Sequence, residues 1–188
     1  MKAIIFDCFG VIALTGTWSE FLRSLPADID TEPLHALNHQ HDSGAISTKE
    51  FLYRLHDITG HEPKQLEEIV KTDNMKNHAL LSYIKSELKP YYKIGLLSNI
   101  ATDWVKSRLL SVDEQAMFDD MVFSYEVGIA KPDPAIFQLA SKRIGEKPEN
   151  ILFTDDIPEN VQSAQRVGMH AVTYTNLQDF KKQVAKLA

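Results

Sequence analysis

Carboxylates follow two of the short apolar runs in this sequence. Asp7 comes after the run at 2–6, and the pair Asp155 and Asp156 comes after the run at 151–153. An aspartate carboxylate can act as a nucleophile. Three carboxylates brought together repel one another unless protons or a cation neutralise them. Because hard oxygen ligands suit Mg²⁺, these residues predict a carboxylate nucleophile beside a magnesium site.

Two further loops carry groups that can hold an anion. Ser98 and Asn99 follow the apolar run at 92–97, and Lys131 lies in the loop after the run at 121–123. The lysine ammonium and the serine hydroxyl can donate to an anion, and a helix beginning after Ser98 would add backbone N–H groups. A carboxylate nucleophile, a divalent metal, a lysine and a hydroxyl donor together indicate phosphoryl transfer.

The elements that must position these residues follow from hydrophobic patterning. The four runs named above, with a fifth at 171–174, are typical of strands buried on both faces of a parallel sheet. Helical patterns separate the later runs; one of them has Asp133 and Pro134 as start signals and Gly145 as a stop signal. This alternation predicts an α/β fold with a doubly wound parallel sheet. Ligands bind outside the carboxyl ends of such strands, so all four loops should meet there.

Residues 14–81 break the alternation and are patterned as helices only. A capping box from Ser47 to Glu50 precedes apolar residues at helical spacing between 51 and 58. We therefore expect a core domain formed by 1–13 and 82–188, with a helical cap domain at 14–81. The apolar residues at 80–88 should begin the return of the chain to the core.

Charge and composition exclude several classes of function. The chain has 188 residues, with 20 Lys and Arg against 26 Asp and Glu, and a net charge of −6. A generic binder of nucleic acid or of anionic membranes needs a basic face instead. No apolar run approaches the roughly 18 residues needed to span a bilayer. Cys8 is the only cysteine, which excludes an intrachain disulfide and favours a reducing, cytoplasmic location.

Four motifs in this order resemble those of the haloacid dehalogenase superfamily of hydrolases. They read DCFGV from Asp7, LLSN ending at Asn99, GIAKPDP around Lys131, and FTDDIPEN around Asp155 and Asp156. The resemblance extends over the whole chain and implies a Rossmann-like core with an inserted cap. It also implies that Asp7 becomes an aspartyl-phosphate, and that Ser98, Asn99 and Lys131 bind the phosphoryl group. The implied Mg²⁺ ligands are Asp7, Asp155, Asp156 and the backbone carbonyl of Phe9.

Phe9 is a departure from the pattern of the family's phosphatases. They usually carry a second Asp at this position, two residues after the nucleophile, as a general acid and base. Losing such a group costs roughly 10²–10⁴-fold in rate. One interpretation is a phosphatase for esters whose leaving group needs little protonation, with sugar 1-phosphates first. The alternatives are a metal-free 2-haloacid dehalogenase, since that class has an aromatic residue here, and a ligand-binding protein without turnover.

The acidic pair favours the phosphatase over the dehalogenase. A metal-free enzyme has no need of adjacent Asp155 and Asp156, which would repel Asp7, whereas a metal site needs them. The expected partner is a small phosphorylated metabolite, and the sequence leaves the oligomeric state open.

For several other reactive or metal-binding side chains, a structural role fits better than a chemical one. Cys8 should point away from the face that Asp7 serves, because neighbouring residues at a strand end alternate. His35, His39 and His41 could form a metal patch, but they fit a solvated helix face better. Trp18, early in the insertion, could line the substrate entrance, although packing inside the cap is commoner for such residues.

Overall fold

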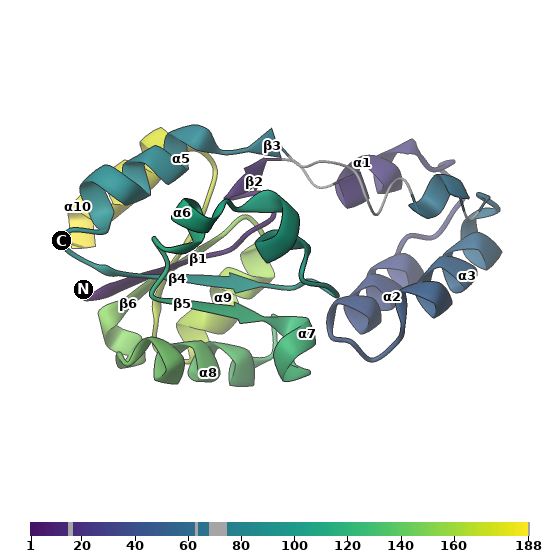
Figure 1. Cartoon of the computed structure of the whole chain (residues 1–188). Coiled ribbons are helices and arrows are strands. Elements are labelled where there is room, and N and C mark those ends of the chain that lie inside the picture. The colour runs from purple at the N-terminus through teal and green to yellow at the C-terminus, as the bar shows by residue number, and fades with distance from the viewer. Residues whose placement is uncertain (15–16, 63, 68–74, 188) are drawn as a thin grey trace.

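A parallel five-stranded sheet forms the centre of the protein (Figure 1). The computed structural model describes residues 1–14, 17–62, 64–67 and 75–187. In space the strands follow the order β5-β4-β1-β6-β7, and each neighbouring pair is parallel. Their bounds are β1 (Ala3–Phe6), β4 (Lys93–Ser98), β5 (Asp120–Phe123), β6 (Ile151–Asp155) and β7 (His170–Thr173). All five expected runs are strands, so the doubly wound α/β fold is confirmed.

Alternate residues of β1 serve two separate cores. Ile4 and Phe6 belong to the hydrophobic cluster on one face of the sheet, and Ala3 and Ile5 belong to the cluster on the other. The first face is covered by α5 (His78–Tyr83), η1 (Ile84–Leu88), η2 (Val105–Leu109) and α10 (Leu177–Leu187). The second is covered by α8 (Pro134–Ile144) and α9 (Pro158–Arg166) (Figure 1). Burial on both faces explains why β1 has no polar residue in its sequence.

Local signals set the ends of α8 as the sequence predicts. The Asp133 side chain accepts a hydrogen bond from the backbone N–H of Ala135 at 2.8 Å, and Pro134 occupies the first helical position. Gly145 closes the helix with φ of 72°, a conformation that favours glycine. Short elements complete the core: α6 (Val112–Gln115), α7 (Ser124–Val127) and η3 (Pro148–Asn150).

The cap is helical, as expected, and has its own hydrophobic cluster built around Phe21, Phe51 and Leu55. Its helices are α1 (Thr17–Ser24), α2 (Glu32–Asp42) and α3 (Thr48–Thr59), with one further helical turn at 64–67. The predicted capping box is only half formed. The Ser47 side chain accepts from the backbone N–H of Glu50 at 3.2 Å, but the Glu50 carboxylate pairs with Arg54 at 2.5 Å instead.

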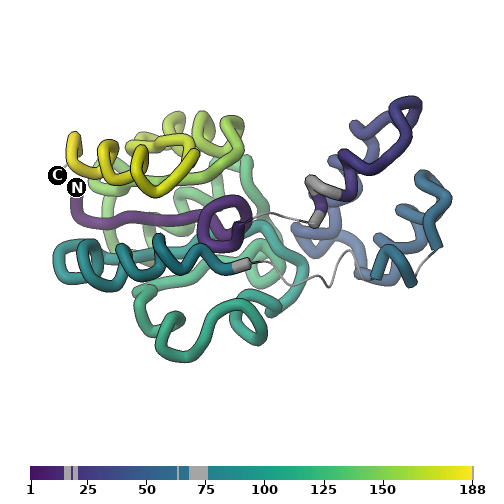
Figure 2. Tube along the Cα trace, turned by 90° about the horizontal axis from the view of Figure 1, so that it is seen from above, coloured from purple at the N-terminus to yellow at the C-terminus, as the bar shows by residue number. Residues whose placement is uncertain are grey.

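A two-stranded antiparallel ribbon joins the cap to the core. It consists of β2 (Ala13–Leu14) and β3 (Met75–Lys76), and Figure 2 shows the cap standing to one side of the core. The chain returns to the core earlier than residue 82. Leu80 and Leu81 on α5 already pack in the cluster that contains Ile84 and Leu88, because the apolar spacing at 80–88 forms one continuous buried face.

Among the described helices, none has the length and apolar character that crossing a membrane would require.

Candidate active site

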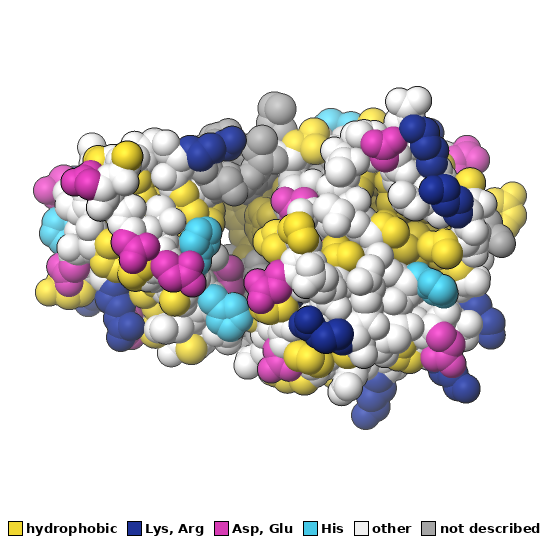
Figure 3. Space-filling model, turned by 180° about the vertical axis from the view of Figure 1, so that it is seen from behind, with side chains coloured by type: hydrophobic (Ala, Val, Ile, Leu, Met, Phe, Trp, Pro, Cys, Tyr) yellow, Lys and Arg dark blue, Asp and Glu magenta, His cyan; other side chains and the backbone are white. Residues whose placement is uncertain are grey.

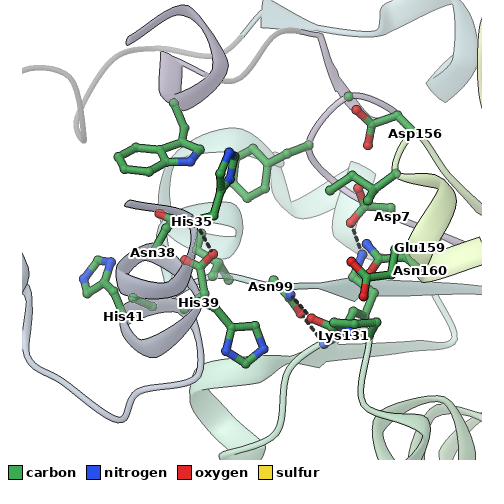
Figure 4. Close-up of a pocket in the computed structure, with 18 of the residues that line it drawn as sticks. Asp7, His35, Asn38, His39, His41, Asn99, Lys131, Asp156, Glu159 and Asn160 are labelled. Atoms are coloured by element: carbon green, nitrogen blue, oxygen red, sulfur yellow. Dashed lines mark hydrogen bonds and ion pairs between the residues drawn. The ribbon is translucent and has the colours of Figure 1, made fainter. Parts of the chain in front are cut away.

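A cavity of about 840 Å³ lies between the cap and the carboxyl ends of the strands. On the core side it is lined by Asp7, Asn99, Lys131 and Asp156, and on the cap side by residues of α1 and α2. Figure 3 shows the hollow from outside, with histidine and acidic side chains at its edge. Figure 4 shows His35 and His39 across the cavity from Asp7, Lys131 and Asp156. The predicted convergence of loops at this end of the sheet is therefore present.

Lys131 is a buried cation held between two carboxylates. Its Nζ lies 2.5 Å from Asp7 Oδ1 and 2.6 Å from Asp155 Oδ2. Lys131 is 2% exposed and Asp155 is fully buried. Asp7, at the carboxyl end of β1, and Asp155, the last residue of β6, come from neighbouring strands in the sheet. The sheet register therefore brings both carboxylates to one ammonium.

The carboxylate of Asp155 is fixed by groups that follow it closely in the chain, in the turn after β6 and at the start of α9. Asn160 Nδ2 donates to both of its oxygens, at 3.1 and 3.0 Å, and the backbone N–H of Ile157 donates to Oδ1 at 2.8 Å. Asp156, next in sequence, is exposed and lines the cavity. The two members of the acidic pair thus differ, because Asp155 orients Lys131 while Asp156 faces the space above Asp7. The contact between Asn160 and Asp155 was not predicted from the sequence, although Asn160 stands within the quoted motif.

The electrostatics of this cluster disfavour a third negative charge. Burial and the negative charge of Asp155 raise the pKa of Asp7 above its usual range, although Lys131 acts to lower it. Burial, followed by the charge of Asp155, also raises the pKa of Asp156. Although burial acts to lower the pKa of Lys131, the charges of Asp155 and Asp7 raise it above its usual value. Lys131 is therefore always charged, and one ammonium cannot neutralise three carboxylates.

The donor set fits a hard divalent cation. Asp7, Asp155 and Asp156 each offer an oxygen, and these atoms all lie within 4.8 Å of one another. They form the one group of this kind found among the described residues. Oxygen ligands of this type suit Mg²⁺, and its charge would relieve the repulsion described above. The predicted fourth ligand, the Phe9 carbonyl, is on the same loop as Asp7 and stays a prediction.

Gly10 leaves the space that Asp156 occupies. A Cβ on Gly10 would lie 2.3 Å from Asp156 Cγ, and the residue has φ of +85°. Only glycine adopts that backbone conformation at no steric cost. The loop after β1 therefore needs glycine both for its own path and for the approach of the Asp156 carboxylate to Asp7.

The two residues predicted to hold the anion after β4 have different surroundings. Ser98 is fully buried and its hydroxyl has no hydrogen-bond partner among the described residues. Asn99 lines the cavity and exchanges hydrogen bonds with the backbone N–H and C=O of Lys131, both at 2.8 Å. Asn99 thus positions the Lys131 loop. A buried hydroxyl without a partner is costly, so Ser98 remains a candidate donor to a phosphoryl oxygen.

The helix expected directly after Ser98 is absent. Residues 99–103 form a loop, and helical structure resumes only at Trp104. The loop carries Asn99 across to Lys131 and bonds through Ile100 to Ser124, and these tertiary contacts override the helical pattern that follows in the sequence. The backbone N–H groups predicted from a helix start are consequently not arranged as expected at this position.

Phe9 forms an apolar part of the cavity wall. Its ring stacks on Trp104 with ring centroids 6.1 Å apart, so this position offers no proton. Cys8 is fully buried in the core. Burial and the nearby charge of Asp7 raise the pKa of its thiol far above the usual value, which disfavours the reactive thiolate form.

The cap contributes a polar wall that the sequence did not predict. His35 and His39 are exposed on α2, as expected of a solvated helix face, and they also line the cavity. His41 is buried and stacks on Phe51 with ring centroids 4.3 Å apart. Trp18 also lines the cavity, as one interpretation expected. Asp42, the last residue of α2, completes this wall.

Comparison with known proteins identifies the class. The model of the haloacid dehalogenase-like hydrolase family matches residues 1–168, and the chain belongs to this family. A D-ribitol-5-phosphate phosphatase of Bacteroides thetaiotaomicron is 27% identical and aligns with 98% of this chain and 97% of its own length. A phosphorylated carbohydrates phosphatase of Thermotoga maritima is 26% identical, with 92% of this chain and 84% of the relative aligned.

Solved structures agree with the fold. The magnesium complex of a haloacid dehalogenase family enzyme from Bacteroides thetaiotaomicron has a TM-score of 0.74 and 25% identity, covering 98% of both chains. Another structure of that enzyme holds magnesium and inorganic phosphate.

One relative matches over a shorter stretch. The drimenol cyclase drtB of Aspergillus calidoustus is 29% identical over 60% of this chain, and the match spans 21% of the length of the cyclase.

Proposed function

We propose that the protein is a Mg²⁺-dependent phosphatase that hydrolyses a small phosphorylated metabolite through an aspartyl-phosphate. The observation that carries this proposal is the cluster of Asp7, Asp155 and Asp156 around Lys131, with carboxylate oxygens within 4.8 Å of one another. Support comes from full-length relatives that are phosphatases and from a structural neighbour that holds magnesium and phosphate.

In the first half-reaction, an oxygen of Asp7 attacks the phosphorus atom and the bond to the leaving oxygen breaks. Lys131 holds the phosphoryl oxygens, because its ammonium lies beside the attacking carboxylate and stays charged. Asp155 keeps that ammonium in place. A divalent cation, held by Asp7, Asp156 and the Phe9 carbonyl with Asp155 beside it, would supply further positive charge for the transferring group.

In the second half-reaction, water attacks the phosphorus atom of the aspartyl-phosphate and regenerates the Asp7 carboxylate. The cap covers the cavity from the side opposite Asp7. Such covers exclude bulk water during the first step and select the leaving group. Specificity for the metabolite should therefore reside in the cap residues that line the cavity.

A sugar 1-phosphate is the first substrate class that we propose. Phe9 supplies no proton at the position where the family's phosphatases usually carry the general acid, and esters with the more acidic leaving groups depend least on such a proton. The phosphatase relatives act on phosphorylated carbohydrates and on ribitol 5-phosphate, as their names state, which supports a small polyhydroxylated leaving group. A cytoplasmic location stays a prediction from the single cysteine.

The test is phosphate release from sugar 1-phosphates, sugar 6-phosphates, acyl phosphates and aryl phosphates, each with Mg²⁺ and with EDTA. We expect turnover that requires Mg²⁺. Asp7→Asn should abolish turnover and leave the fold unchanged, because the amide is nearly isosteric but not nucleophilic. Retained turnover in the purified variant would rule out the aspartyl-phosphate.

Phe9 also fits the metal-free 2-haloacid dehalogenase, and the same experiment separates the two functions. Halide release that is insensitive to EDTA, without phosphate release, would support the dehalogenase. Binding of Mg²⁺ without turnover of any ester would support a ligand-binding protein instead. The carboxylate cluster argues against both, since neither needs to hold three carboxylates together.

A further inference from the structure

The proposed function leaves one proton without a source. When an alkyl or sugar oxygen leaves phosphorus it needs a proton, and Phe9 has none to give. The cavity wall opposite Asp7 includes α2 of the cap, and Asp42 is one of the residues that line it. The following inference rests on the proposed function and concerns the leaving-group side of the same site.

Asp42 is anchored to the core through its backbone. Its carbonyl accepts a hydrogen bond from the hydroxyl of Ser124, and the same hydroxyl accepts from the backbone N–H of Ile100 at 2.8 Å. Ile100 adjoins Asn99, which binds the backbone of Lys131. A short chain of hydrogen bonds therefore fixes the end of α2 against the loop that positions the catalytic lysine.

The side chain of Asp42 is also held in one orientation. Asn38 Nδ2 donates to Asp42 Oδ2 at 2.8 Å, and no ion pair to Asp42 occurs among the described residues. By contrast, the imidazole rings of His35 and His39 make no hydrogen bond within the part of the chain that the structure describes, and both residues are exposed. Of the titratable groups that α2 brings to the cavity, Asp42 is the one whose backbone carbonyl is bonded to the core and whose carboxyl is held by a hydrogen bond.

The carboxyl of Asp42 is available in its protonated form near neutral pH. Burial raises its pKa from 3.8 to about 7, although the hydrogen bond from Asn38 and the charge of Lys131 act to lower it. Its position in the last turn of α2 further disfavours a negative charge, because of the helix dipole. A carboxylic acid that exchanges its proton near the working pH suits general acid catalysis.

We propose that Asp42 is the general acid and base of this active site, in place of the residue missing at position 9. As Asp7 forms its bond to phosphorus, the Asp42 carboxyl donates its proton to the departing oxygen, which leaves as a neutral hydroxyl. The Asp42 carboxylate then takes a proton from the water that attacks the aspartyl-phosphate. The two steps together consume one ester and one water and return Asp7 and Asp42 to their starting forms.

The proposal predicts a loss that depends on the leaving group. With Mg²⁺ present, Asp42→Asn should lower kcat by roughly 10²–10⁴-fold for an alkyl ester such as D-ribitol 5-phosphate. The loss should be smaller for glucose 1-phosphate and only a few-fold for p-nitrophenyl phosphate, whose leaving group needs no proton. The matched control is Asp57→Asn, the same chemical change at an exposed site of the cap on α3, which should leave all three rates unchanged.

The pH profile gives a second readout. For the alkyl ester, kcat of the wild type should fall as the pH rises through the pKa of Asp42, because the acid form is lost, and Asp42→Asn should lack that fall. The charged and titratable groups on the elements around Asp42 are Lys131 of the core, Tyr125 and Glu126 on α7, and His35, His39 and His41 on α2. Lys131 stays charged throughout. Asp42→Glu, which keeps an ionisable carboxyl, should recover part of the alkyl rate and the falling limb.

Three outcomes would overturn the proposal. An equal loss on all three esters would show that Asp42 only shapes the cavity, and an unchanged alkyl rate would show that another group supplies the proton. A general loss with a lowered Tm, and no recovery in Asp42→Glu, would show a structural role. Failure of the proposed function itself is distinguishable, because the wild type would then not hydrolyse p-nitrophenyl phosphate either.

Discussion

At the scale of the residue, the charge of Lys131 is the feature on which the rest of the site depends. The ammonium neutralises two carboxylates that have almost no access to water. Breaking a buried ion pair by removing one partner costs far more than the pair contributes, because the remaining charge is left without compensation. The same residue therefore serves both stability and the binding of the phosphoryl group.

Lys131→Met should consequently destabilise the metal-free protein strongly. We expect a loss of about 3–5 kcal/mol in the free energy of unfolding, measured by urea denaturation. Added Mg²⁺ should restore more stability in this variant than in the wild type, because it supplies the missing charge. The control is Lys106→Met, which removes a partly exposed pair with Glu126 at 2.6 Å and should cost at most about 1 kcal/mol. Equal losses in the two variants would contradict the role given to Lys131.

Gly10→Ala tests the approach of Asp156 to Asp7. The new Cβ would displace the Asp156 carboxylate and would also strain the backbone at φ of +85°. Gly60→Ala is the matched control, since Gly60 has φ of +70° but nothing within 4 Å of its Cβ position. Both variants should lose about 1–2 kcal/mol of stability, and only Gly10→Ala should bind Mg²⁺ more weakly in calorimetry. Unchanged Mg²⁺ affinity in Gly10→Ala would argue against Asp156 as a ligand.

At the scale of the element, the strands were the most predictable part of the molecule. The run at 2–6 is apolar throughout because β1 is central and packs on helices at both faces. The ends of α8 were equally predictable from the sequence, because Asp133 and Gly145 act through local hydrogen bonds alone. The loop at 99–103 could not be predicted, because its path depends on hydrogen bonds to Lys131 and Ser124, which are far away in sequence.

The junction between the cap and the core depends on Asn77. Its Oδ1 accepts from the backbone N–H of Leu80 at 3.2 Å and so caps α5. Its Nδ2 donates to the Val11 carbonyl and to the Tyr174 hydroxyl, both at 2.9 Å. One buried side chain thus joins the start of α5 to the loop before β2 and to the far side of the core.

Two substitutions separate these contributions. Asn77→Asp keeps the cap of α5 but loses the donors, whereas Asn77→Ala loses both. We expect Asn77→Ala to cost about 2–4 kcal/mol, from a lost cap and buried acceptors left without partners, measured by thermal unfolding. Asn77→Asp at pH 7 should be no more stable than Asn77→Ala, because its buried carboxylate faces the acceptor oxygen of the Val11 carbonyl. Wild-type stability in both variants would show that the junction is held elsewhere.

At the scale of the whole molecule, the site exists only where two separately packed units meet. The cap and the core have distinct hydrophobic clusters, and the cavity lies between them. The core half of the site could be predicted from the sequence because strand ends of a parallel sheet converge by topology. The cap half could not, because which face of α2 turns toward Asp7 depends on how the cap docks, and Asp42 carries no local motif.

The free energy of unfolding should depend on pH through the buried carboxyl of Asp42. Its pKa is raised by burial to about 7 in the folded state, against about 3.9 in the unfolded chain. A carboxyl with a raised pKa favours the unfolded state once the pH exceeds the unfolded value, because unfolding then releases a proton. The penalty should therefore grow between about pH 4 and pH 7 and stay constant above.

Asp42→Asn should accordingly unfold at the same temperature as the wild type at pH 4 and at a higher temperature at pH 8. A gain of each 1 kcal/mol corresponds to about 2–4 °C for a chain of this size, which differential scanning calorimetry resolves. The comparison is made in EDTA, so that binding of a cation at Asp7 does not enter. A variant that is more stable and yet slower on alkyl esters would show that Asp42 is retained for chemistry. A variant less stable at pH 8 would mean that the ionised carboxylate supports the fold, against the raised pKa from which the acid role was argued.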